Sequence, residues 1–179
     1  MATLAYKGQT VHTAGELPPT GRRCPDFSLL RPDLSALALA DLAGRRVVLN
    51  IFPSLDTTVC ARSVLAFDAR SGDASNLSIV NVSADLPFAQ RRFSESTDLR
   101  GVAFGSTFRN PGFGRDFGVL MVDGPLRGLM ARAVVVLDER GTVVHAELVP
   151  ELTCEADYDR ALDVLRQPAP SPEDALAGR

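Results

Sequence analysis

A single cysteine, Cys60, lies where the sequence makes nucleophilic chemistry easy to place. The apolar run VVLNIF ends in a proline-bearing turn, and two threonines then lead to Cys60 and a segment with helical spacing. This order puts a thiol in the first turn of a helix, where unpaired backbone N–H groups and the helix dipole favour an anionic thiolate. Free cysteine is also among the most buried residue types, so a simple packing role is the alternative interpretation.

The residues before Cys60 narrow the kind of redox chemistry. A dithiol oxidoreductase of the thioredoxin type has two cysteines spaced C-x-x-C, and here the first of these positions is Thr57. Exchange between two thiols of one motif is therefore excluded. The Thr57 hydroxyl, one helical turn ahead of the thiol, can donate to a molecule bound over the sulfur, and Thr57 can also be the helix N-cap. Pro53 stiffens the loop, because its φ is fixed and it has no N–H.

Strand-like runs alternate with helical spacing along the chain. The last two strands are expected to form a hairpin, because two β-branched runs flank the turn residues Asp138 to Gly141. The alternation predicts an α/β sheet with helices on both faces, and the late hairpin makes this sheet mixed rather than purely parallel. The predicted strands are 9–13, 26–30, 45–52, 77–84, 101–107, 117–122 and the two arms of 132–149.

Three segments have the spacing of helices. The first follows Thr57 and has one apolar face, formed by Ala61, Val64 and Leu65. In the second, Asp85 can cap the helix and Pro87 can occupy its first turn. The third is a closing helix, and its apolar positions near one face are Ala156, Ala161, Leu162 and Leu165.

The bulk composition indicates one ordinary globular domain. We expect this domain to span 1–166 of the 179 residues, with a Pro/Ala-rich, disordered tail at 167–179. A formal net charge of −3 with scattered arginines gives no footprint for nucleic acid or an anionic membrane. The first residues do not have the pattern of a signal peptide, and no apolar run approaches the length of a membrane span, so a cytoplasmic protein is expected. The three cysteines and two histidines are too dispersed for a zinc site, and no metal is expected.

At this point several motifs together resemble one known family. The segment PSLDTTVCARSV is similar to the active-site segment of the peroxiredoxins, P-x-x-x-T-x-x-C, in which Pro53, Thr57 and Cys60 occupy the motif positions. Four further segments resemble the thiol peroxidase subfamily: GQTVHTAG, SADLPFAQRRF, DGPLRGLMARAVVVLDERG and ELVPELTCEADYDRAL. The resemblance covers nearly the whole chain except the tail.

The resemblance implies a fold, an activity and a set of site residues. The fold would be thioredoxin-like with an N-terminal β-hairpin, and the activity would be reduction of hydrogen peroxide and organic hydroperoxides through a Cys60 sulfenic acid. Arg132 would stabilise the thiolate and orient the peroxide; by burial statistics alone it would be a surface residue of a strand. A thioredoxin or similar dithiol would be the reductant, with no cofactor, in a homodimer for which FRNPGF is a candidate contact.

One position departs from the subfamily pattern. The resolving cysteine of the subfamily follows the RF of FAQ..RF, and this position is Ser94 here. Ser94 could be an engineered replacement of a cysteine, or the enzyme could use one cysteine and an external thiol. Alternatively, Cys24 or Cys154 could resolve the sulfenic acid, although both are expected to be packed thiols. A peroxide sensor or thiol-binding protein with little turnover is the alternative function.

Overall fold

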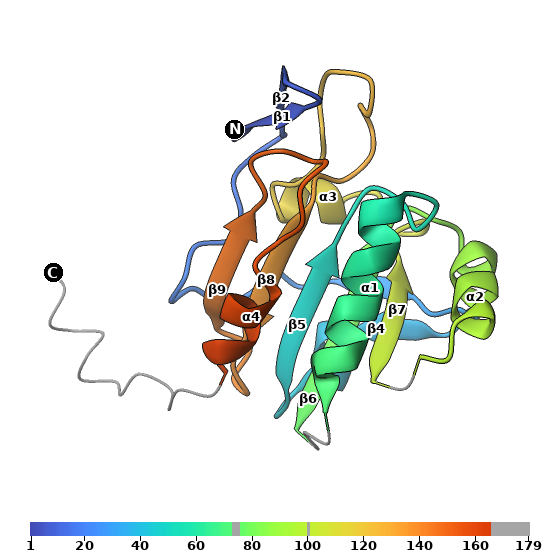
Figure 1. Cartoon of the computed structure of the whole chain (residues 1–179). Helices are drawn as coiled ribbons and strands as arrows, with labels where there is room; N and C mark the ends of the chain where they lie inside the picture. Colours follow the sequence, from blue (N-terminus) through green and yellow to red (C-terminus); the bar gives the residue numbers. More distant parts are fainter. Residues whose placement is uncertain (73–75, 100, 166–179) are drawn as a thin grey trace, which may run out of the picture.

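A seven-stranded mixed sheet forms the centre of the computed structural model, which describes residues 1–72, 76–99 and 101–165 (Figure 1). The strand order is β4-β3-β7-β6-β5-β8-β9, and a separate two-stranded hairpin, β1-β2, stands apart from it. The strands are β1 (Thr3–Tyr6), β2 (Gln9–His12), β3 (Ser28–Leu30), β4 (Ala36–Ala38), β5 (Arg46–Ile51), β6 (Leu77–Ser83), β7 (Val102–Ser106), β8 (Ala133–Leu137) and β9 (Val143–Leu148). The helices are α1 (Thr58–Ser71), α2 (Pro87–Ser96), α3 (Phe113–Asp116), α4 (Tyr158–Asp163) and a 3-10 helix at Leu39–Leu42.

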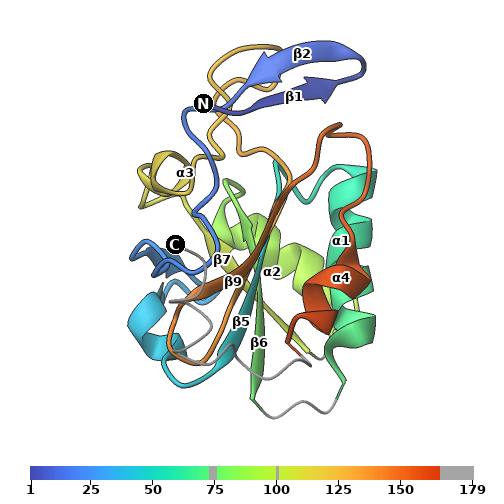
Figure 2. The same ribbon diagram turned by 90° about the vertical axis from the view of Figure 1, so that its left-hand side faces the viewer.

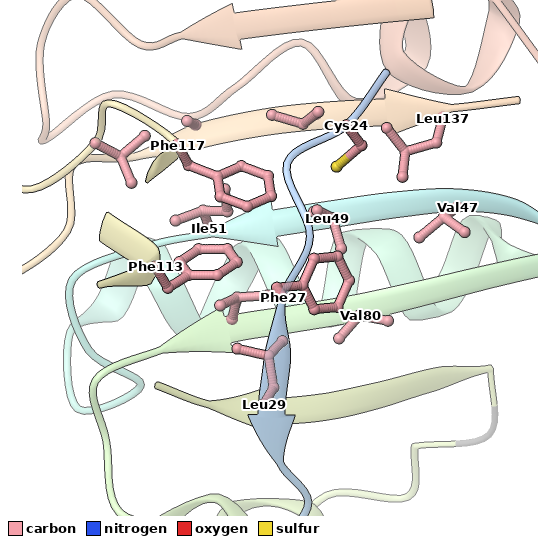
Figure 3. Packing of buried hydrophobic residues seen from close by; sticks show 14 of the residues in the cluster. Cys24, Phe27, Leu29, Val47, Leu49, Ile51, Val80, Phe113, Phe117 and Leu137 are labelled. Carbon is pink, nitrogen blue, oxygen red and sulfur yellow. The ribbon is translucent and has the colours of Figure 1, made fainter. Parts of the chain in front are cut away.

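The central strands are mostly apolar because both faces of the sheet are covered. Strands β5, β6 and β7 run parallel, while β8 pairs antiparallel with β5 and β9 pairs antiparallel with β8. Alternate residues of β5 point to opposite faces. Val48 packs with the cluster under α1 and α4, and Val47 and Leu49 pack with a second cluster that contains Phe27 and Phe117. Figure 3 shows this second cluster, and Figure 1 shows α1 and α4 on the opposite face.

The hairpin lies beyond the end of the sheet at which β5 leads into α1 (Figures 1 and 2). Strands β1 and β2 pair antiparallel in the register Tyr6–Gln9, so Lys7 and Gly8 form a two-residue turn. Both turn residues have positive φ, 52° and 77°, as a type I′ hairpin turn requires. The hairpin and mixed sheet therefore agree with the architecture predicted from the sequence. The proposed tail at 167–179 lies outside the described residues, and no helix within them is long and apolar enough to cross a membrane.

Two local predictions were wrong for identifiable reasons. Residues 117–122 form no strand, because the chain makes the short helix α3 and then turns at Gly118, where φ is 68°. A Cβ at Gly118 would lie 2.0 Å from the Glu16 carbonyl oxygen, so only glycine fits this turn. In α1, Leu65 is exposed, because the buried face follows helical spacing through Cys60, Ser63, Val64 and Phe67.

Candidate active site

Cys60 lies at the start of α1, which follows the end of β5. Strand β5 ends at Ile51, and the five-residue loop 52–56 leads to Thr57, which has extended dihedral angles and occupies the N-cap position. Cys60 is the third residue of α1, within the turn whose backbone N–H groups have no partner inside the helix. Those N–H groups and the helix dipole favour negative charge, so this position stabilises a thiolate relative to a thiol.

The Arg132 guanidinium supplies a cation at the same sulfur. Ala133 of β8 pairs with Ile51 of β5, and this register places Arg132 beside the loop that follows β5. Arg132 Nη2 lies 3.4 Å from the Cys60 sulfur, although only 2% of the arginine is exposed. Nε and Nη2 also donate to the Leu152 carbonyl oxygen, at 3.3 and 3.1 Å. The surface position suggested by burial statistics was therefore wrong, and the juxtaposition implied by the family resemblance is present.

One amino group of Arg132 has no partner. Nη1 is buried and makes no hydrogen bond to the described residues. Burying such a donor is costly unless something accepts from it. A small oxygen-bearing molecule next to the Cys60 sulfur would give Nη1 an acceptor, so the arginine is suited to hold a substrate as well as the thiolate.

Pro53 and Thr57 form the rest of the predicted motif. Pro53 is buried within the β5–α1 loop, and Thr57 is exposed at its end. The Thr57 hydroxyl makes no capping bond and instead donates to the Ser54 carbonyl oxygen at 3.1 Å. Thr57 is thus an N-cap by backbone position only, and its hydroxyl stabilises the turn ahead of the helix.

Asp85 fixes this loop from a neighbouring segment. Its carboxylate accepts from the Ser54 hydroxyl at 2.7 Å and from the Leu55 N–H at 2.8 Å. The prediction that Asp85 caps α2 was wrong: Leu86 is the N-cap, because the carboxylate is turned toward the β5–α1 loop. Pro87 does occupy the first turn of α2, as expected. Asp85, in the segment before α2, therefore fixes the position of the β5–α1 loop before α1.

Apolar side chains enclose the sulfur. Cys60 has no exposed surface, and it packs in a cluster with Phe52, Leu55, Val64 and Phe104. The side chain of Phe93, on α2, packs against the same cluster. The next residue is Ser94, which is half-buried on α2. The helix carrying the resolving position thus lies against the Cys60 cluster through Phe93, but the resolving position itself holds a hydroxyl instead of a thiol.

A buried network of polar side chains lies behind Cys60, and it was not predicted from the sequence. Asn50 of β5 donates to Ser63 Oγ at 3.0 Å and to Asn81 Oδ1 at 2.8 Å, and the Ser63 hydroxyl donates to the Cys60 carbonyl oxygen at 2.7 Å. The network ties the first turns of α1 to the two central strands. A usable signal was present, because an asparagine interrupts each apolar run, VVLNIF and LSIVNVSA. Buried polar side chains of this kind require partners.

The two other thiols differ from Cys60 and from one another. Cys24 is packed as predicted, in the cluster drawn in Figure 3, and burial together with the nearby Asp26 carboxylate raises the pKa of its thiol from 9.0 to about 12. Cys154 was also expected to be packed, but it is exposed. It lies in a turn closed by its own N–H to the Glu151 carbonyl oxygen, which leaves its side chain on the outer surface.

Comparison with known proteins places the chain in a family. The redoxin family model matches residues 19–162. Thiol peroxidases of Mycobacterium tuberculosis and Mycobacterium bovis are 46% identical over 165 residues, which cover 92% of this chain and 99% of theirs. The chain belongs to the redoxin family. Its sequence similarity to the mycobacterial thiol peroxidases identifies it within that family as a thiol-dependent peroxidase, an oxidoreductase.

Solved structures agree with the assignment of the fold. A peroxiredoxin-like protein from Aquifex aeolicus superimposes with a TM-score of 0.87 and 34% identity, covering 93% of this chain and 97% of that chain. A thiol peroxidase from Chromobacterium violaceum has a TM-score of 0.83 at 23% identity, covering 92% and 95%. The thioredoxin-like architecture predicted from the sequence is therefore confirmed.

Proposed function

We propose that Cys60 is the peroxidatic nucleophile of this thiol peroxidase. Its thiolate attacks the terminal oxygen of a hydroperoxide, the O–O bond breaks, and Cys60 becomes a sulfenic acid. The leaving oxygen takes a proton to become water or an alcohol. The single observation that carries this proposal is the 3.4 Å contact between Arg132 Nη2 and a sulfur at the N-terminal turn of α1.

Each neighbouring group has a role in this step. Arg132 stabilises the thiolate, and its unpartnered Nη1 donates to the peroxide. The N–H groups of the first turn stabilise the charge that develops on the leaving oxygen. Pro53 keeps the loop rigid, and Thr57, after rotation of its hydroxyl away from Ser54, donates to the second oxygen.

The burial of Cys60 affects the order of events. The β5–α1 loop and the Phe93 side chain of α2 cover the sulfur, which has no exposed surface. A substrate therefore reaches the sulfur only when these groups move. Hydrogen peroxide needs a smaller opening than a bulky organic hydroperoxide. Both are proposed substrates, and hydrogen peroxide is expected to react with Cys60 faster than a bulky organic hydroperoxide because it needs the smaller opening.

A coupled assay with thioredoxin, thioredoxin reductase and NADPH tests the proposal. Cys60→Ser is expected to abolish peroxide consumption, because a hydroxyl at this position is not ionised and cannot accept an oxygen atom. Cys24→Ser is the matched control, since it removes another buried thiol of the same chain and should retain turnover. Persistent activity in Cys60→Ser would assign the chemistry to another thiol and contradict the proposal.

For the second half of the cycle, we propose that an external dithiol of the thioredoxin type reduces the Cys60 sulfenic acid directly. Ser94 cannot form a disulfide, and the raised pKa of Cys24 keeps that thiol protonated and unreactive. Cys154 is the remaining intramolecular alternative because it is exposed. It lies in the loop whose Leu152 carbonyl accepts from Arg132.

Intact mass after one equivalent of peroxide separates these routes. A gain of one oxygen indicates a stable sulfenic acid awaiting an external thiol, whereas loss of two hydrogens indicates an internal disulfide. Cys154→Ser is expected to leave both the mass change and steady-state turnover unaltered. If Cys154→Ser alone abolishes a disulfide seen in the unsubstituted protein, the external route is wrong. Oxidation without any turnover would instead favour the peroxide sensor.

A homodimer and a cytoplasmic location complete the proposal. Phe88 at the start of α2 is 60% exposed and Phe108 in the β7–α3 loop is 61% exposed, which supports a contact near the active-site loops. Of the two phenylalanines in the segment FRNPGF, Phe108 is exposed and available for such a contact, whereas Phe113 is fully buried. Light scattering on the purified protein and on Phe108→Asp tests the assembly, and the variant is expected to shift toward the monomer.

A further inference from the structure

We propose that the N-terminal hairpin is part of the peroxidase site, because Glu151 couples it to the carbonyl group that positions Arg132. The inference rests on the proposed role of Arg132 at Cys60. Glu151 touches neither the sulfur nor the guanidinium, so it is a positioning residue. The hairpin, β1-β2, lies above the segment that joins β9 to α4, and this segment passes beside the start of α1 (Figure 2).

The hairpin binds this segment through backbone hydrogen bonds. The Ala5 N–H donates to the Pro150 carbonyl oxygen at 2.7 Å, and the Leu152 N–H donates to the Ala5 carbonyl oxygen at 2.9 Å. Ala5 and Glu151 form an isolated parallel bridge, so 150–152 runs alongside β1 at this point. The Leu152 backbone is consequently fixed by a donor bond to the hairpin on one side.

The Glu151 carboxylate joins the hairpin turn to the same segment. Its two oxygens accept from the N–H groups of Lys7 and Gly8, each at 3.1 Å. The type I′ turn exposes these N–H groups together, since both residues have positive φ. One of the oxygens also accepts from the N–H and hydroxyl of Thr153. These backbone and hydroxyl donors lower the pKa of the Glu151 carboxyl to about 2.

Leu152 transmits the position of the segment to Arg132. Its carbonyl oxygen is the acceptor for Nε and Nη2, and Nη2 is the nitrogen that contacts the Cys60 sulfur. A planar guanidinium held by two of its donors has little freedom to rotate. Apolar packing supports the same link, because Leu152 and Ala131, the neighbour of Arg132, share a cluster with Leu4 and Val11 of the hairpin.

The contacts form a continuous path from the hairpin turn to the sulfur. Replacing the carboxylate by an amide would leave one acceptor oxygen for the donors of Lys7, Gly8 and Thr153 and would set an NH2 group against them, and so would loosen 150–152. The Leu152 carbonyl oxygen would then hold the guanidinium less firmly. A displacement of about 1 Å in a reacting geometry can cost on the order of 100-fold in rate, so even partial loosening is measurable.

Glu151→Gln tests the coupling, with Glu139→Gln as the matched control. Glu139 is also a carboxylate of lowered pKa that holds two segments together, but its partner is Arg46 at the opposite end of the sheet. We expect Glu151→Gln to slow the reaction of Cys60 with hydrogen peroxide roughly tenfold and to move the pH midpoint of its alkylation by iodoacetamide upward. Glu139→Gln is expected to lower the melting temperature to a similar extent but to change neither the rate nor the midpoint.

A double-mutant cycle with Arg132→Met shows whether Glu151 acts through the arginine. In the Arg132→Met background, Glu151→Gln should have no further effect on the rate. A full additional tenfold loss in that background, or an unchanged rate in Glu151→Gln alone, overturns the inference. An Arg132→Met variant with wild-type rate would instead overturn the proposed site. Should Glu151→Gln fail to fold, Glu151→Asp retains the charge on a shorter side chain and is expected to show a smaller loss of rate.

Discussion

Two buried cysteines of this chain, Cys60 and Cys24, have opposite chemical surroundings. Both side chains are almost inaccessible, with 0% and 4% of their surface exposed. Cys60 lies in the first turn of α1 with an arginine nitrogen 3.4 Å away. Cys24 lies in an extended segment beside the Asp26 carboxylate, among the apolar side chains of Figure 3, and the pKa of its thiol is raised to about 12.

The difference shows that burial does not decide whether a thiol is reactive. Removing a thiolate from water costs free energy at either position. At Cys60 the helix N-terminus and the guanidinium replace the lost hydration, whereas at Cys24 the Asp26 carboxylate has the same sign as a thiolate and disfavours it. The neighbours, and in particular their charge and direction, determine which of the two cysteines is suited to act as a nucleophile.

Arg132→Met is the strongest way to make Cys60 resemble Cys24. Methionine has a long side chain that fills similar space, but it removes the cation and leaves the Leu152 carbonyl oxygen without its arginine donors. We expect the second-order rate constant for hydrogen peroxide to fall about 100-fold, as for loss of one group that stabilises the reacting charge. Stopped-flow measurement of peroxide consumption gives this constant.

Arg62→Met is the matched control for that experiment. Arg62 is also near Cys60, on the exposed side of α1, where it lies 3.9 Å from Glu155. Exposed pairs contribute little, so the rate should remain close to that of the unsubstituted protein. Equal losses in the two variants would mean that general positive charge, rather than the Arg132 contact, supports the thiolate.

A smaller effect is expected from Cys24 at alkaline pH. The folded-state pKa of about 12 exceeds the ordinary value of 9.0, so the protonated thiol contributes to stability below pH 9 and this contribution is lost as pH rises toward 12. Relative to Cys24→Ala, the unsubstituted protein should lose about 1 kcal/mol of unfolding free energy per pH unit above 9. Urea unfolding at a series of pH values measures this difference.

Cys154→Ala provides the control, because it removes an exposed thiol from the same chain. The gap between Cys154→Ala and the unsubstituted protein should stay constant over the same pH range. If Cys24→Ala shows a constant gap as well, then the Cys24 environment is not the source of the alkaline loss.

Local sequence patterns predicted the elements better than the contacts between them. The apolar run at β5, the start of α1 and the hairpin around Asp138–Gly141 follow from spacing and turn chemistry. Arg132 could not be placed in this way, because its burial depends on the antiparallel pairing of β8 with β5, two strands far apart in the chain. Only the family resemblance linked this residue to Cys60.

The errors have the same origin. FGVLMV has the composition of a strand, yet Gly118 packs against the backbone of Glu16, a contact between distant segments that forces a turn. Asp85 has the local signal of a helix cap, but the Ser54 hydroxyl and Leu55 N–H compete for its carboxylate. In the Asp85 case, the local sequence indicates one hydrogen-bond partner, but the folded chain brings other partners closer to the carboxylate.

The two hydrogen bonds that the Asp85 carboxylate accepts from the β5–α1 loop have a consequence for the reduction step of the proposed cycle. These bonds hold the β5–α1 loop against the segment before α2, around a sulfur that has no exposed surface. A protein reductant needs its own sulfur in direct contact with that of Cys60, which the closed loop forbids. Reduction of the proposed Cys60 sulfenic acid therefore needs a wider opening of this loop than a small peroxide does, and the two hydrogen bonds to Asp85 oppose that opening.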